Sequence, residues 1–154
     1  MKKVLYGILI FGAFLIPTQP QKLETLKPVE VIQLTKNGAM IRITTDITDT
    51  GEGRTVAEAL IALKNSTAGT VYLDTTKYLL VTDETVELID EMRPYLKYAV
   101  RMCISRGQVN LEKAAEFLRI HEPNLQLKDY RAGIGVQNLE LYDGKMILKE
   151  NVKK

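Results

Sequence analysis

The sequence is poor in the residues that build disulfides and zinc sites. Among 154 residues there is one cysteine, Cys103, and one histidine, His121. A single thiol cannot form an internal disulfide, and no Cys or His pairs lie at the spacing of a zinc site. We therefore expect no cofactor. Cys103 lies in an apolar run, where a thiol is typically a core residue of little reactivity. We expect His121 to lie at the end of a helix.

An excess of one charge is also lacking. The formal net charge is +2, and without Lys2 and Lys3 the chain has as many basic as acidic residues. A neutral body does not attract the phosphates of nucleic acid, so we expect no nucleic-acid partner. The motifs of serine and cysteine hydrolases and of nucleotide-binding loops are missing too. Together these absences favour binding over catalysis.

No hydrophobic run is long enough for an ordinary transmembrane helix. Lys2 and Lys3 precede thirteen uncharged residues, Val4–Ile16, and a segment with prolines follows. Thirteen helical residues span ~20 Å, less than the ~30 Å hydrocarbon core. The pattern predicts a signal peptide or N-terminal anchor at 1–20, a linker at 21–28 and one domain at 29–154. The protein is then exported, either secreted or tethered to a membrane. The alternative is a cytosolic protein that buries residues 4–16 in its core.

Two turn signals predict β-hairpins. Asn37-Gly38 separates two apolar, β-branched runs, and Asp143-Gly144 lies within a second such pair at 138–149. Both dipeptides tolerate the positive φ angles of two-residue hairpin turns. Alternation of Leu139 and Leu141 with Glu140 indicates a strand with one solvated face. We therefore expect a hairpin near each end of the domain.

Three helices are predicted between these hairpins. Thr55 and Glu58 form a capping box before a helix with one apolar face. A second helix is expected after Thr82-Asp83 and before Pro94, and a third after Asn110. Apolar strands are expected at 70–73, 78–81 and 98–104. The order predicts an α/β (α+β) fold, with a mixed β-sheet, about three helices packed on it and the C-terminal β-hairpin. The apolar helix positions are Val56, Ala59, Leu60 and Leu63, then Val86, Ile89 and Met92, then Leu111, Ala114, Ala115 and Leu118.

Two regions are candidate binding sites. The polar segment between the first hairpin and the first helix carries Asp46, Asp49, Glu52 and Arg54. Its carboxylates are suited to calcium or to acid–base catalysis, but their spacing does not fit an EF-hand. The alternative is a solvated connection whose glycines allow tight turning. The C-terminal hairpin offers Tyr142 and Lys145 as an interaction surface, and its edge could add to a neighbouring sheet to form a homo-oligomer.

The first helix carries a motif that resembles a known family. Residues 53–60, GRTVAEAL, with Leu63 and the strand runs 71–73 and 79–81, are similar to the N-terminal domain of the C subunit of spore-germinant receptors, the GerAC family. The resemblance covers residues 29–118. It implies a non-enzymatic, extracytoplasmic binding subunit at a membrane, and it carries no ligand residue over to this chain. The chain departs from the family because it lacks a lipobox cysteine and the two further domains.

The sequence therefore predicts an exported, non-enzymatic protein-interaction module at the cell envelope, related to spore-germination receptor subunits. Its partner is expected to be an envelope or membrane protein. Two alternatives stay open. One is a small secreted hydrolase that uses Asp46, Asp49 and Glu52. The other is a structural envelope protein that assembles through exposed strand edges.

Overall fold

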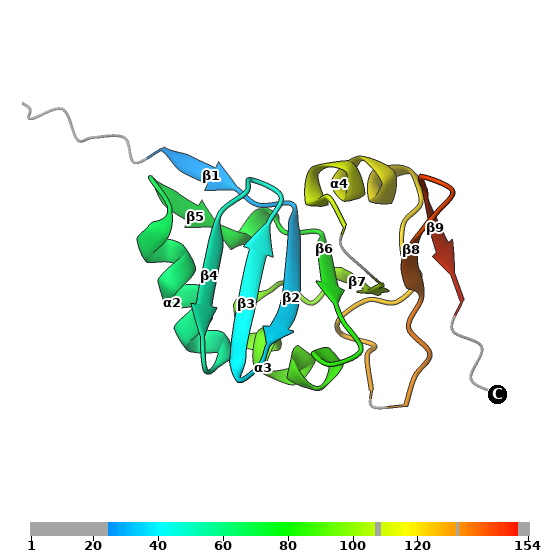
Figure 1. Ribbon diagram of the computed structural model, residues 1–154, viewed down its shortest axis with the longest axis horizontal. Helices are drawn as coiled ribbons and strands as arrows, with labels where there is room; N and C mark the ends of the chain where they lie inside the picture. Colours follow the sequence, from blue (N-terminus) through cyan, green and yellow to red (C-terminus); the bar gives the residue numbers. More distant parts are fainter. Residues whose placement is uncertain (1–24, 107–108, 132, 151–154) are drawn as a thin grey trace, which may run out of the picture.

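A seven-stranded mixed sheet forms the centre of the molecule. The computed structural model describes residues 25–106, 109–131 and 133–150, so the expected signal peptide or anchor lies outside the described residues. The strand order is β4-β3-β2-β6-β7-β8-β9 (Figure 1). β2, β6, β7 and β8 run parallel, whereas β3, β4 and β9 pair antiparallel at the two ends. The predicted α+β class is confirmed. None of the helices in the described ranges is both long and apolar enough to cross a bilayer.

The first hairpin joins β2 (Val31–Asn37) to β3 (Met40–Thr45). Asn37 pairs with Met40, so the two turn residues are Gly38 and Ala39, one position later than the sequence suggests. Gly38 has a φ of 62° at the first turn position, where a type II′ turn requires glycine. Asn37 is left in the strand, and the hairpin itself is confirmed.

The segment after this hairpin was predicted to be a loop, and this is wrong for its second half. Its second half is β4 (Thr50–Gly53), which pairs antiparallel with β3 at the edge of the sheet. Both glycines of β4 lie against α2 (Val56–Ser66). A Cβ atom on Gly53 would come within 2.5 Å of the backbone nitrogen of Ala59. These glycines therefore allow β4 to pack closely against α2, whereas the sequence suggested that they allow a tight turn.

The predicted capping box begins α2. The Thr55 hydroxyl accepts the N–H of Glu58 at 3.2 Å. The Glu58 carboxylate reaches back to accept the N–H of Arg54 at 2.8 Å, one residue before the cap. The expected apolar face is buried, which fixes α2 against β3 and β4: Val56, Ala59, Leu60 and Leu63.

Part of the expected linker is a strand. β1 (Leu26–Pro28) pairs in parallel with β5 (Thr70–Tyr72) in a separate two-stranded sheet. The N–H of Val29, which is fully buried, then donates to the carbonyl of Tyr72 at 3.3 Å. Residues 26–28 are ordered because this pairing and the burial of Val29 anchor them.

The second half of the domain alternates strands and helices. The second expected helix is a single α-helical turn, α3 (Ile89–Met92), flanked by 3₁₀ turns. The strand expected at 98–104 is β7 (Arg101–Ser105), which begins three residues later. Asn110 caps α4 by accepting the N–H of Lys113 at 3.0 Å. The second hairpin turns at Asp143 and Gly144, both with positive φ, as predicted. The elements are the 3₁₀ turn Leu73–Thr75, β6 (Tyr78–Val81), the 3₁₀ turn Val86–Leu88, α3 (Ile89–Met92), the 3₁₀ turn Arg93–Tyr95, β7 (Arg101–Ser105), α4 (Leu111–Ile120), β8 (Asn138–Tyr142) and β9 (Lys145–Lys149).

The sheet separates two hydrophobic cores. Alternation along β6 sends Leu79 to the core under α2 and α3, and Leu80 to the core under α4. Cys103 lies in the α4 core, where burial raises the pKa of its thiol to about 12. Its predicted role as a core residue is confirmed. Because α4 packs over the β2–β8 part of its face, the polar surface of β3 and β4 stays accessible beside it.

Candidate functional site

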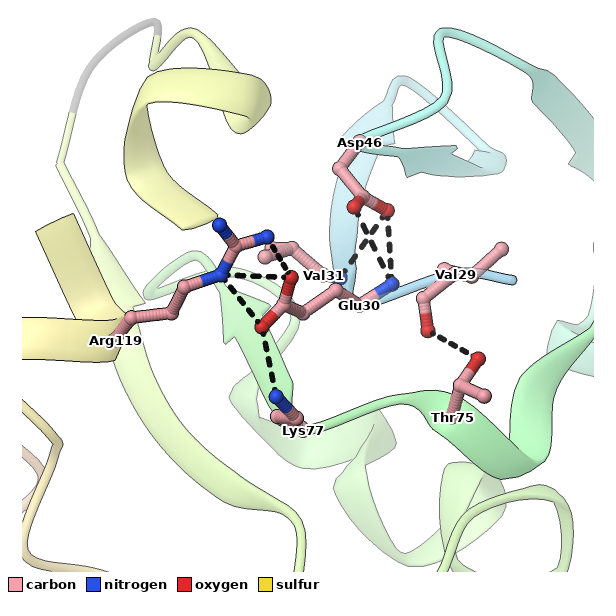
Figure 2. A network of polar contacts seen from close by, with 7 residues as sticks. All are labelled: Val29, Glu30, Val31, Asp46, Thr75, Lys77 and Arg119. Carbon is pink, nitrogen blue, oxygen red and sulfur yellow. Dashed lines mark hydrogen bonds and ion pairs between the residues drawn. The ribbon is translucent and has the colours of Figure 1, made fainter. Parts of the chain in front are cut away.

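The predicted binding loop contains Asp46, whose carboxylate is part of the fold. Its Oδ1 accepts the N–H groups of Glu30 at 3.1 Å and Val31 at 3.2 Å, and so fixes the start of β2 (Figure 2). Burial raises the pKa of Asp46, although these hydrogen bonds act in the opposite direction. The side chain therefore acts as an anchor for the backbone.

The other loop carboxylates also have protein partners. Asp49 pairs with Lys27 at 3.3 Å, and Glu52 pairs with Arg42 at 2.6 Å. Asp46 and Glu52 line one polar groove of about 700 Å³ beside the start of α4, whereas Asp49 and Arg54 are not among its lining residues. No three acidic, histidine or cysteine side chains in the described ranges gather as a metal site would require. The structure thus brings together only two of the four predicted loop residues.

Sequence reasoning missed Glu30, the centre of a polar network that joins distant elements (Figure 2). The guanidinium of Arg119, at the end of α4, donates to both carboxylate oxygens of Glu30, and Lys77 before β6 lies 3.2 Å away. Hydrogen bonds from Arg119, and in addition one from Lys77, lower the pKa of Glu30. An acidic residue between Val29 and Val31 in an apolar run was the available signal. The network ties α4 to the start of two central strands.

α4 and the C-terminal hairpin form a groove with apolar and polar lining residues, which we call the hairpin surface. It is lined by Phe117 and Ile120 of α4, Leu141 of β8 and Met146 of β9, and encloses about 780 Å³. Ile120 is 78% exposed and Leu141 is 49% exposed. Asn110, Lys113 and Glu116 form its polar part. Exposed apolar side chains beside polar ones are common at protein-binding surfaces.

Both predicted interaction residues lie on the C-terminal hairpin, but neither is among the residues that line the groove. Tyr142 is 68% exposed, and Lys145 is exposed at the first position of β9. His121 caps the end of α4, as expected, and its ring stacks on Phe117 with the ring centres 4.6 Å apart. A second hollow of about 340 Å³ runs beside β9, lined by Phe117, His121 and the three apolar residues of that strand.

The chain matches no protein family, curated protein or solved structure. Of the three regions, the loop carboxylates and the Glu30 network are engaged within the fold. The hairpin surface leaves apolar side chains without cover among the described residues.

Proposed function

We propose that this chain is an exported, non-enzymatic protein-interaction module at the cell envelope, which docks a partner protein on its hairpin surface. The exposure of Ile120 and Leu141 around one groove carries the proposal. Apolar side chains gathered in this way lose contact with water when a partner covers them. The C-terminal hairpin lies at the opposite end of the molecule from β1, the first strand among the described residues (Figure 1).

The cellular setting in this proposal comes from the sequence. Lys2 and Lys3 before an apolar run support export. The GRTVAEAL motif supports a relationship to the C subunit of spore-germinant receptors. At this motif Thr55 caps α2 directly after β4, which agrees with a helix that begins after a hairpin.

A capture experiment with surface variants tests the proposal. The full chain, kept in a mild detergent, is crosslinked to envelope extract as wild type, as I120D/L141D and as I61D. Ile61 on α2 is 59% exposed and lies outside the groove, so it is the matched control. We expect the double variant to lose a specific crosslinked protein that wild type and I61D both retain. Equal capture by all three, with their melting temperatures unchanged, contradicts docking at this surface.

Two alternatives stay predictions. A hydrolase would need Asp46 and Glu52, which line the same groove, to be released from Glu30, Val31 and Arg42. A structural protein would need identical chains to pair through β9. Hydrolysis that is lost in E52Q would favour the first, and a β9-dependent oligomer would favour the second.

A further inference from the structure

Within the described ranges, β9 has no strand paired with the side of its backbone that faces away from β8. Among the described strands it pairs with β8, at one end of the sheet (Figure 1). The two-residue turn makes Tyr142 and Lys145 a hydrogen-bonded pair, and such pairs alternate along an antiparallel ladder. Met146 and Leu148 therefore direct their N–H and C=O groups away from β8. No bond to these groups occurs among the turn, loop and cap hydrogen bonds of the described residues. The edge has free ladder positions for another strand.

One face of this edge already has an apolar wall. Met146 and Leu148 pack toward the α4 core. The hollow beside β9 is bounded on the helix side by Phe117 and His121. A strand added to β9 places alternate side chains over this hollow, because side chains alternate between the two faces of a sheet. Two apolar side chains, separated by one residue, would extend the core.

The opposite face of β9 carries positive charge around one apolar residue. Lys145, Ile147 and Lys149 share this face by the same alternation. Lys145 has no ion pair among the described residues, while Lys149 lies 3.0 Å from Glu140 on β8. Opposite charges on neighbouring strands stabilise the pairing, and like charges destabilise it. On this face, a complementary strand therefore presents an apolar side chain opposite Ile147, with an acidic side chain before and after it opposite the two lysines.

A second copy of this chain fits the edge poorly. Antiparallel pairing of two β9 strands about Ile147 would set Lys145 of each copy opposite Lys149 of the other. Lysines on an edge strand are a common device against self-pairing. The edge therefore favours a different chain with acidic flanks.

We propose that β9 binds an extended segment of the partner protein as an eighth strand, with apolar residues at its centre and acidic residues flanking them. This inference rests on the proposed function, since it names the chemistry of the partner. Backbone hydrogen bonds to Met146 and Leu148 supply the pairing, and Lys145 and Lys149 select the charge. Recognition by strand addition is well known for exposed sheet edges.

The probe is a blocked heptapeptide, acetyl-Thr-Glu-Val-Ile-Val-Glu-Thr-amide, with a Lys-for-Glu version as its comparison. Each is titrated into ¹⁵N-labelled full chain in mild detergent, and amide chemical shifts are followed by NMR. We expect the largest shifts at Met146 and Leu148. We expect the acidic peptide to bind about tenfold more tightly than the basic one, equivalent to ~1.4 kcal/mol.

Two pairs of variants separate backbone pairing from other effects. L148P and L148A both remove the leucine side chain, but only L148P also removes the outward N–H. We expect L148P to abolish binding and L148A to keep most of it. K145E/K149E should reverse the charge preference, while K64E, on the exposed side of α2, should leave it unchanged. Melting temperatures of all variants establish that they fold.

Several outcomes overturn the inference. These are equal affinity for both peptides, equal losses in L148P and L148A, or no reversal in K145E/K149E. A dimer in sedimentation that L148P removes would assign the edge to a second copy instead. If I120D/L141D still loses envelope capture while no peptide binds, docking at the hairpin surface stands and strand addition fails. If capture is also unaffected, both fail.

Discussion

Replacing Gly51 or Gly53 with alanine should destabilise the protein through a steric clash between β4 and α2. An added Cβ on Gly53 would lie 2.5 Å from the Ala59 nitrogen and from the Glu58 Cβ. One on Gly51 would overlap the carbonyl oxygen of Ala59 and the backbone nitrogen of Leu63. Ordinary contacts begin at 3.4 Å. Because backbone atoms of a helix cannot rotate away, the strand and helix must separate.

The size of the effect follows from two opposing contributions. Glycine-to-alanine changes at unstrained sites gain ~0.4–1 kcal/mol by restricting the unfolded chain. Overpacking costs ~1–3 kcal/mol, and a clash with backbone lies at or above the upper end. We therefore expect G51A to lower the free energy of unfolding by ~2 kcal/mol, which lowers the melting temperature by ~8 °C.

Urea unfolding followed by circular dichroism measures this change, and G144A is the control. Gly144 has a φ of 73° and nothing within 4 Å of an added Cβ, so its alanine variant tests backbone strain without overlap. We expect it to cost ~1 kcal/mol. NMR shifts should concentrate in β4 and α2 for G51A and in the C-terminal hairpin for G144A. A G51A variant within ~0.5 kcal/mol of wild type would refute the close approach of β4 and α2.

Three further predictions concern single side chains. Glu30→Gln should cost about 1 kcal/mol at pH 7, less than a charged hydrogen bond usually contributes, because the Arg119 side chain is 55% exposed to solvent. Because folding lowers the pKa of Glu30, the difference in unfolding free energy between this variant and wild type should be complete above the usual pKa of 4.5. It should vanish as the pH falls through the pKa of Glu30 in the folded protein. Urea titrations at several pH values measure this difference, and a difference that does not change with pH contradicts the ion pair. Cys103 should react with a thiol reagent only as fast as the protein opens, because burial raises the pKa of its thiol to about 12; rapid labelling of native protein contradicts its burial. Thr55→Ala should lower the free energy of unfolding by ~1 kcal/mol through loss of the cap on the Glu58 N–H, whereas no change in urea unfolding would argue against that cap.

Local signals in the sequence predicted the first and third helices and both hairpins well. The caps at Thr55 and Asn110 were readable because a side-chain oxygen satisfies a nearby N–H, which is a property of a few adjacent residues. The turn at Asp143-Gly144 was readable because both residues accept positive φ. Cys103 was placed correctly because its neighbours are apolar. These features depend on short stretches of chain.

Features set by distant partners were missed. Thr50–Gly53 has two glycines and low strand propensity, and it is a strand because β3 pairs with it and α2 packs closely on it. Leu26–Pro28 becomes a strand only because β5 lies beside it. Glu30 meets Arg119, a residue 89 positions away. On the C-terminal hairpin the sequence named Tyr142 and Lys145, and neither of them lines the hairpin surface. The contribution of Ile120 was missed because it depends on how α4 crosses the sheet.

The two edges of the main sheet differ in a way that bears on function. β4 is four residues long, carries two glycines and is packed against α2, so it offers a short edge with little side-chain area. β9 is longer, with three partly buried apolar residues between two lysines. Short edges and edge lysines both limit unwanted pairing, but lysines leave an edge open to an acidic strand. Met146 and Leu148 of β9 pack toward the core under α4, and the contact of Arg119 with Glu30 holds α4 to the start of β2. If a partner segment adds to β9 as proposed, it would meet this apolar face beside an edge flanked by lysines.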